Sequence, residues 1–179
     1  AGAHSWEDAA QAILMFNRGI IDAVSDIVPS VKVQIAYYEQ YGTAGLHAFY
    51  ETLRYAKEQG LVVITDAKRN DIGATASQYA AAFLGETNVG ENTFSAFPSD
   101  FLTVNGYLGS DGITPFVEQC QKHDKGSFVL VQTRNPSSGE LQNLKLVDGR
   151  TVDECMGDVV SLCVLRTPRA YRSASLAPA

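Results

Sequence analysis

The hydrophobic positions of this chain follow two alternating spacings, one typical of strands and one typical of helices. Four short apolar runs begin near residues 28, 61, 101 and 127, and each is typical of a buried strand. Between them, apolar side chains recur every three to four residues, which indicates amphipathic helices. Repeated strand–helix units predict a parallel sheet with crossover helices, and therefore an α/β fold. We expect helices at Ser5 to about Asp26, Thr43–Gln59, about Gly73–Leu84, Asp111–His123 and Thr151 to about Cys163, and strands at Val28–Gln34, 61–66, Phe101–Asn105 and Ser127–Gln132.

Local signals refine the helices and the connections between them. Ser5 and Asp8 have the spacing of a capping box, and Thr43 and Asp111 are expected to be N-caps. Residues 85–98 and 140–150 are polar and predict irregular excursions. The first helix is expected to bury the face formed by Ile13, Phe16, Ile20 and Val24.

The strand at 61–66 changes abruptly from apolar residues to charged ones. Because side chains alternate along a strand, Asp66 and Lys68 are expected on the same side, and Asp71 follows after a short turn. Three ionisable groups at the end of a buried strand are costly unless they pair with each other or with a ligand. Two interpretations stay open here: an ion pair that only caps the strand, and a charged functional site.

The order Asp-x-Lys-x-x-Asp over Asp66–Asp71, followed by Ile72 and Thr75, resembles the catalytic signature of the orotidine 5'-phosphate decarboxylase family, in its longer bacterial branch. The similarity covers about Phe16 to Gly157, most of the chain. Four further segments resemble that family in the family's order, which argues against coincidence: Phe16–Asn17, Val31–Gln34, Thr103–Gly109 and Asn135–Ser138.

This resemblance implies a (β/α)8 TIM barrel, of which the chain supplies about four βα units. A barrel of that type needs about 250 residues, with a lower range near 200. We therefore expect a partial barrel domain over residues 1–160. The family's first strand is expected before Ala1, and its last strands, with the phosphate-gripping loops, after residue 160. Residues 161–179 contain three arginines and two prolines but no acidic residue, which predicts an irregular tail, disordered or aberrant in origin.

The resemblance also implies a reaction, the removal of CO2 from C6 of orotidine 5'-monophosphate to give uridine 5'-monophosphate, without a metal or an organic cofactor. Lys68 would be the cation beside the developing carbanion and the proton donor, and Asp66 would face the departing carboxylate. Lys32 and Asp71 would complete an alternating array of lysines and aspartates. Without the family match, Lys32 reads as a strand-end lysine that reaches solvent.

Further residues are implicated by the same resemblance. The resemblance implies a homodimer with shared sites, because in that family the residues at the positions of Asp71, Ile72 and Thr75 act in the site of the partner subunit. Asn105 would line the substrate pocket, although a turn asparagine is an equal alternative. Arg134 stands where the family has a serine that contacts the pyrimidine, and the neighbouring Thr133 is the expected substitute.

Composition and charge narrow the possible partners. The chain has 179 residues, 45% of them hydrophobic, which suits one domain with a real core. Its net charge of −6 and the lack of a basic stripe indicate no nucleic-acid surface. The sequence shows no membrane span or signal peptide, so a cytoplasmic location is expected. The three histidines and three cysteines match no metal-ligand spacing, so no metal is expected.

Two other functional interpretations remain. One is another sugar-phosphate barrel lyase that shares the Asp-x-Lys-x-x-Asp array and is usually metal-assisted. The other is a non-catalytic half-barrel that associates through exposed sheet edges. Because the phosphate-gripping loops are expected outside this chain, we predict that the chain is inactive by itself.

Overall fold

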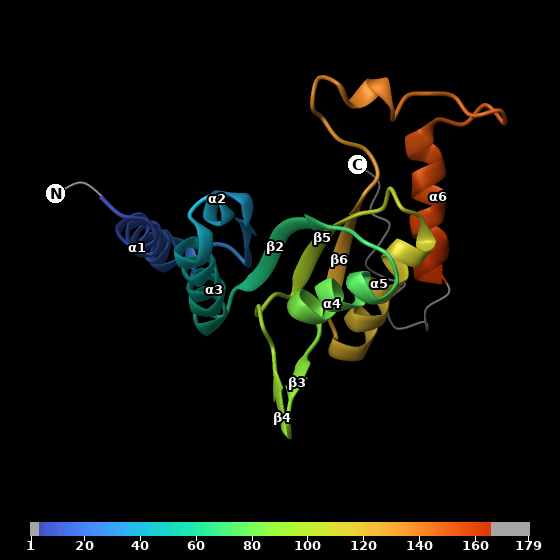
Figure 1. Cartoon of the computed structure of the whole chain (residues 1–179). Coiled ribbons are helices and arrows are strands. Elements are labelled where there is room, and N and C mark those ends of the chain that lie inside the picture. The colour runs from blue at the N-terminus through green and yellow to red at the C-terminus, as the bar shows by residue number, and fades with distance from the viewer. Residues whose placement is uncertain (1–3, 166–179) are drawn as a thin grey trace.

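The computed structural model describes residues 4–165 as a parallel four-stranded sheet with helices packed along it and a separate β-hairpin (Figure 1). This arrangement confirms the α/β prediction. The elements are α1 (Trp6–Val24), β1 (Ser30–Gln34), α2 (Ala36–Glu39), α3 (Gly42–Glu58), β2 (Val62–Arg69), α4 (Gly73–Leu84), β3 (Thr87–Val89), β4 (Asn92–Phe94), β5 (Phe101–Asn105), α5 (Ser110–His123), β6 (Gly126–Leu130), a 3-10 turn (Ser138–Glu140) and α6 (Val152–Leu165).

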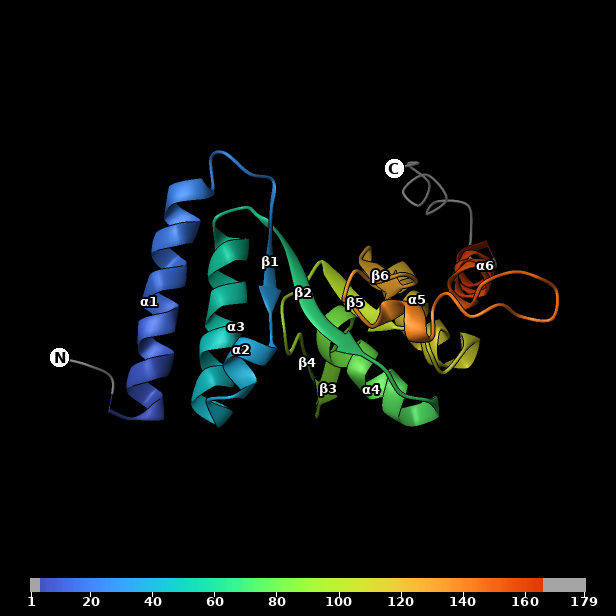
Figure 2. The same ribbon diagram turned by 90° about the horizontal axis from the view of Figure 1, so that it is seen from above.

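The sheet order is β1-β2-β5-β6, so the four strands lie side by side in the order in which they follow along the chain. All neighbouring pairs are parallel. Strands added in sequence with intervening helices are the arrangement of a (β/α) barrel. Figure 2 shows α1 outside α3 at the β1 end and α6 at the opposite end of the molecule. Within the described residues, β1 and β6 each pair on one side only.

The hydrophobic core lies between the sheet and helices α3, α4 and α5. Val63, Leu102 and Val104 from the sheet are completely buried. They pack in one cluster with Leu53 of α3 and Phe116 of α5. The helices therefore hold the strands in register, and the strand ends carry the polar side chains.

The predicted buried face of α1 is wrong in part. Phe16 is 68% exposed and Ile20 is 48% exposed, whereas Leu14 and Ile21 are buried. The reason is that α1 packs mainly against α3, and only the side chains of α1 that face α3 are covered. The predicted capping box is confirmed in part: the Asp8 N–H donates to the Ser5 hydroxyl at 3.1 Å, but the Asp8 carboxylate accepts the N–H of His4 in place of that of Ser5.

Two predicted N-caps are wrong. Helix α3 begins before Thr43, at Gly42, whose φ of +59° suits a glycine. Helix α5 begins before Asp111, at Ser110, and the Asp111 carboxylate instead accepts the Gly112 N–H within the first turn. The predicted bounds of α4, Gly73–Leu84, are confirmed.

The connections contain more regular structure than the sequence predicts. Segment 85–98 carries the β3–β4 hairpin, which projects away from the sheet (Figure 1). Helix α2 is a single unpredicted turn between β1 and α3. Helix α6 extends to Leu165 and so includes residues 161–165, the start of the segment expected to be irregular. Residues 166–179, the rest of that segment, lie outside the described residues.

Candidate active site

The candidate site lies where β1, β2 and β5 approach their carboxyl ends. These strands are parallel, so their ends meet at one edge of the sheet. Lys32 comes from β1, Asp66 and Lys68 come from β2, and Thr103 comes from β5. In (β/α) barrels this is the face on which catalytic residues gather.

Asp66 is the centre of this group. Its Oδ2 accepts a hydrogen bond from the Lys32 ammonium at 2.7 Å, and its Oδ1 accepts one from the Lys68 ammonium at 2.5 Å. The Thr103 hydroxyl donates to the same Oδ1 at 2.9 Å. Asp66 is buried, whereas the side chains of Lys32 and Lys68 are 54% and 46% exposed. The structure therefore brings three predicted residues into one ion cluster with two cations that reach solvent.

The surroundings of Asp66 favour its charged form. Burial by itself raises the pKa of this carboxyl, but the hydrogen bonds from Lys32, Lys68 and Thr103 outweigh burial and hold the pKa at about 2, against an ordinary value of 3.8. Asp66 is consequently a carboxylate throughout the physiological pH range, and it keeps both ammonium groups oriented toward one point.

This depressed pKa predicts a contribution to stability that is lost in acid. Because the folded-state pKa lies below the unfolded-state value, the contribution is complete above about pH 4 and disappears as the pH falls through about 2. We expect about 1–2 kcal/mol, the lower figure allowing for solvent screening of the half-exposed lysines. Urea unfolding of the chain and of Asp66→Asn from pH 6 to pH 2 measures it. The stability gap between the two proteins must shrink on acidification, and a gap that is constant across this range contradicts the prediction.

Asp71, Ile72 and Thr75 lie away from this cluster within the described chain. The Asp71 carboxylate accepts the N–H of its neighbour Ile72 at 2.8 Å, and no hydrogen bond or ion pair joins it to Lys68 among the described residues. Ile72 is 54% exposed, and Thr75 is exposed on the first turn of α4. Of the predicted array, hydrogen bonds join Lys32, Asp66 and Lys68 within this chain, and Asp71, which is half-buried, is not part of that cluster.

The two remaining predicted residues are held in turns. Asn105, at the end of β5, accepts the Tyr107 N–H at 2.9 Å, the role of a turn asparagine. Thr133, after β6, donates to Asn135 at 2.6 Å and accepts from the Gln142 amide at 2.8 Å. Arg134 is exposed. Asn105 is the last residue of β5 and Thr133 follows β6, but both side chains already bond to local partners.

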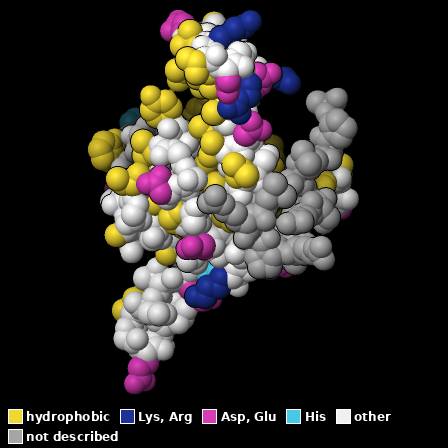
Figure 3. All heavy atoms as spheres, turned by 90° about the vertical axis from the view of Figure 1, so that its right-hand side faces the viewer, with side chains coloured by type: hydrophobic (Ala, Val, Ile, Leu, Met, Phe, Trp, Pro, Cys, Tyr) yellow, Lys and Arg dark blue, Asp and Glu magenta, His cyan; other side chains and the backbone are white. Residues whose placement is uncertain are grey.

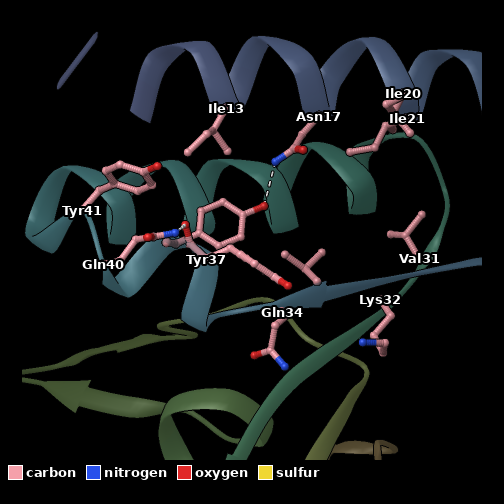
Figure 4. Close-up of a pocket in the computed structure, with 12 residues that line it drawn as sticks. Ile13, Asn17, Ile20, Ile21, Val31, Lys32, Gln34, Tyr37, Gln40 and Tyr41 are labelled. Carbon is pink, nitrogen blue, oxygen red and sulfur yellow. Dashed lines mark hydrogen bonds between the residues drawn. The ribbon is translucent and has the colours of Figure 1, made fainter. Parts of the chain in front are cut away.

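A groove of about 580 Å³ opens beside β1, on the side that has no neighbouring strand among the described residues. Figure 4 shows Ile13, Asn17 and Ile21 of α1 facing it from above, with Tyr37 of α2 and the following Gln40 at one end. Asn17 donates to the Tyr38 hydroxyl at 2.7 Å and so ties α1 to α2. Lys32 belongs to this lining, whereas Asp66 and Lys68 do not. The groove therefore runs along the open sheet edge, next to the ion cluster.

Sequence reasoning missed Thr103 as a member of the site. It was recognised only within a family-like segment, because its contact with Asp66 depends on the pairing of β5 with β2. The described residues contain no group of three or more His, Cys, Asp or Glu side chains suited to a metal ion. No described helix has both the length and the hydrophobicity required to cross a membrane.

The chain is similar to known proteins over most of its length. The family described as "Orotidine 5'-phosphate decarboxylase / HUMPS family" matches residues 17–157. An orotidine 5'-phosphate decarboxylase of Rhodopirellula baltica is 47% identical over 155 residues, which are 87% of this chain and 50% of that protein. One of Caldicellulosiruptor saccharolyticus is 50% identical over 133 residues, 74% of this chain and 44% of that protein.

A solved structure agrees with these relatives. The OMP decarboxylase of Leishmania donovani is 29% identical, with a TM-score of 0.71 over 87% of this chain and 55% of that chain. This chain therefore spans about half the length of the relatives that it matches, and its four-stranded sheet corresponds to part of their TIM barrel.

Proposed function

This chain belongs to the orotidine 5'-phosphate decarboxylase / HUMPS family, and we propose that it supplies the charged half of a site that converts orotidine 5'-monophosphate to uridine 5'-monophosphate and CO2. The observation that carries this proposal is the Lys32–Asp66–Lys68 cluster at the carboxyl end of the sheet. The relatives' names favour the decarboxylase over another sugar-phosphate lyase with the same array.

The difficult step of this reaction leaves an electron pair on C6 of the pyrimidine. The bond between C6 and the carboxylate carbon breaks, CO2 departs, and the pair stays on C6 until a proton arrives. Lys68 is the proposed donor: its ammonium is held by Asp66, and its side chain is 46% exposed and therefore accessible to a substrate. A fixed cation stabilises the developing negative charge, and its proton then completes the product, after which solvent returns a proton to the amine.

Asp66 has two proposed roles. As a carboxylate it holds the Lys68 side chain in place, since Lys68 Nζ donates to Asp66 Oδ1 at 2.5 Å. It also faces the substrate carboxylate, and two like charges 4 Å apart repel by about 4 kcal/mol at an effective dielectric constant near 20. Loss of CO2 relieves this repulsion. Lys32 pairs with the second oxygen of Asp66, so the three side chains together carry one net positive charge toward the anionic substrate.

Substrate contacts from the later strands belong to the same proposal. Asn105 would line the pocket, and Thr133 would contact the pyrimidine in place of the family's serine. Thr133 retains an acceptor site, because its hydroxyl donates once and accepts once. Arg134 is exposed beside it and is the point at which this chain departs from the family pattern.

We further propose that the enzyme is a homodimer with shared sites. Asp71 is half-buried just after β2, Ile72 and Thr75 are exposed, and a 54% exposed isoleucine at this position suits contact with a second chain. A cytoplasmic location is part of the proposal, because a charged nucleotide does not cross a lipid bilayer unaided.

The open surfaces of the chain indicate that it works with the other half of a barrel. Both sheet edges are unpaired among the described residues. The segment between β6 and α6 lies at the top of the molecule in Figure 1, and Figure 3 shows apolar side chains gathered at the top of one face. That segment contains the exposed Leu141, Leu144, Leu146 and Val147. A complete barrel would cover edges and apolar surface of this kind.

We therefore predict that the 179-residue chain alone does not decarboxylate orotidine 5'-monophosphate, and that the chain extended at both ends to the length of its relatives does. Binding energy from the phosphate group, which the added strands would supply, normally drives the chemical step. Loss of ultraviolet absorbance of the substrate measures the reaction. Activity of the 179-residue chain by itself would contradict the half-barrel proposal, and inactivity of the properly folded extended chain would contradict the proposed reaction.

A further inference from the structure

The pairing of β2 with β5 is irregular at the site. Thr65 pairs with Leu102, and the next pair is Arg69 with Val104. Three residues of β2, 66–68, therefore stand opposite the single residue Thr103. Extra residues in one strand lose their ladder hydrogen bonds, and buried backbone groups without partners are costly.

The Thr103 hydroxyl replaces the missing ladder bonds. It accepts the N–H groups of Ala67 and Lys68, each at 3.0 Å, and it donates to Asp66 Oδ1 at 2.9 Å. A hydroxyl has one donor and two acceptor positions. All three are used here, and all three are directed at the same irregular stretch of β2.

The backbone of Lys68 makes this support necessary. Its φ of +45° lies in the left-handed region, which is uncommon for a residue with a side chain. Conformations of this kind persist only where the surroundings hold them, and they cluster at functional sites. The turn of the backbone brings the Lys68 ammonium back to Asp66, two residues earlier, at 2.5 Å.

We propose that Thr103 is a positioning residue for the site: its hydroxyl fixes the irregular segment 66–68 so that the carboxylate of Asp66 and the ammonium of Lys68 converge. Thr103 acts through these two residues and does not itself take part in the chemistry. Its role in catalysis rests on the proposed function, whereas its role in geometry does not.

The test compares Thr103→Val, which keeps the shape and removes the hydroxyl, with Thr103→Ser, which keeps the hydroxyl. Thr65→Val is the matched control, because it removes a buried β2 hydroxyl that bonds to Ser99 and not to Asp66. In the 179-residue chain, carboxyl-carbon NMR titration reports the pKa of Asp66, and amide hydrogen exchange reports the Lys68 N–H.

In Thr103→Val we expect the pKa of Asp66 to rise by roughly one pH unit and the Lys68 amide to exchange about tenfold faster, since each loses one hydrogen bond. Thr103→Ser and Thr65→Val should leave both values close to those of the unmodified chain. An unchanged pKa and an unchanged exchange rate in folded Thr103→Val would overturn the proposal. If that variant does not fold, a folded Thr103→Ser with displaced values would overturn it equally.

A kinetic measurement on the extended chain separates this proposal from the proposed function. We expect Thr103→Val to lower kcat at least tenfold with little change in KM, and Thr103→Ser to restore it. Should the extended chain prove inactive toward orotidine 5'-monophosphate, the proposed function fails, while the titration and exchange results still decide the positioning role.

Discussion

Lys68→Ala in the extended chain is expected to lower the rate of decarboxylation by roughly 10⁴-fold or more, because it removes both a stabilising cation and the proton donor. The effect should fall on kcat, since the ammonium acts on charge that develops in the transition state. Folding should change little, because the Lys68 side chain is 46% exposed and its ion pair is only partly shielded. Ultraviolet assays of initial rates over a range of substrate concentrations measure kcat and KM separately.

Lys57→Ala is the matched control for that experiment. Lys57 also forms a short ion pair with an aspartate, Asp100, at 2.7 Å, but it lies at the end of α3 and outside the cluster. We expect its kcat to stay within about twofold of the unmodified protein, because partly exposed ion pairs contribute little. Equal losses in the two lysine variants would contradict a specific role for Lys68.

The shared-site proposal adds a second control. If Asp71 serves the partner's site, then Lys68→Ala and Asp71→Ala are each inactive, yet a mixed dimer of the two contains one site with both original residues. With random exchange of subunits, half of the dimers are mixed, so the mixture should regain about a quarter of the original activity. A mixture that stays inactive after verified subunit exchange would place Asp71 in the same chain's site, or show that the sites are not shared.

Gly45→Ala is expected to destabilise the chain by about 3 kcal/mol, which is at the upper end for overpacking. A methyl group built on Gly45 of α3 would lie 1.9 Å from the backbone oxygen of Tyr38 in α2. Backbone cannot yield as the end of a flexible side chain can, so α2 must move away from α3. That displacement would also disturb the Asn17–Tyr38 hydrogen bond at the groove. Urea unfolding at neutral pH measures the change in the free energy of unfolding.

Gly19→Ala provides the opposite expectation within the same fold. Gly19 lies in the interior of α1, and a methyl group there would have no neighbour within 4 Å. Alanine favours the helical state by about 1 kcal/mol over glycine, so this variant should be slightly more stable than the original. A Gly45→Ala variant as stable as Gly19→Ala would show that α2 does not pack closely on α3.

Sequence patterns predicted those parts of the fold in which local signals agree with packing. The predicted bounds of α4 are correct because this alanine-rich helix begins at one glycine, Gly73, and ends just before another, Gly85. The face of α1 is only partly correct because Ile13, Leu14, Ile20 and Ile21 form adjacent apolar stripes. Which stripe is covered depends on where α3 lies, and the periodicity of α1 contains no such information.

The sequence patterns predicted neither the hairpin nor the full length of β2. All residues of β3 and β4 are exposed, so no alternation of buried and exposed positions marks them. The expected end of the central strand was residue 66, where the apolar run stops, but β2 continues to Arg69. The N–H groups of Ala67 and Lys68 donate to a hydroxyl from β5, and Arg69 pairs with Val104 of that strand. Only the register of two distant segments reveals these contacts.

The candidate site was predictable as a motif and less so as an arrangement. Strand alternation predicted Asp66 and Lys68 on the same side, but their contact depends on the left-handed backbone of Lys68. Lys32 was predicted only through the resemblance to a family. Asn105 and Thr133 lie at strand ends as expected, but their hydrogen bonds to nearby turns have no signature in the sequence. Whether these residues act on a substrate stays a prediction.

The three-against-one pairing of β2 and β5 has a consequence for protein engineering. Grafting the peptide 65–69 into the strand of another barrel would not transfer the cluster, because an ordinary strand would straighten Lys68 out of its left-handed conformation. The smallest portable unit spans two strands and includes the threonine of the second. A designer who copies the linear motif alone would obtain the right residues with the wrong geometry.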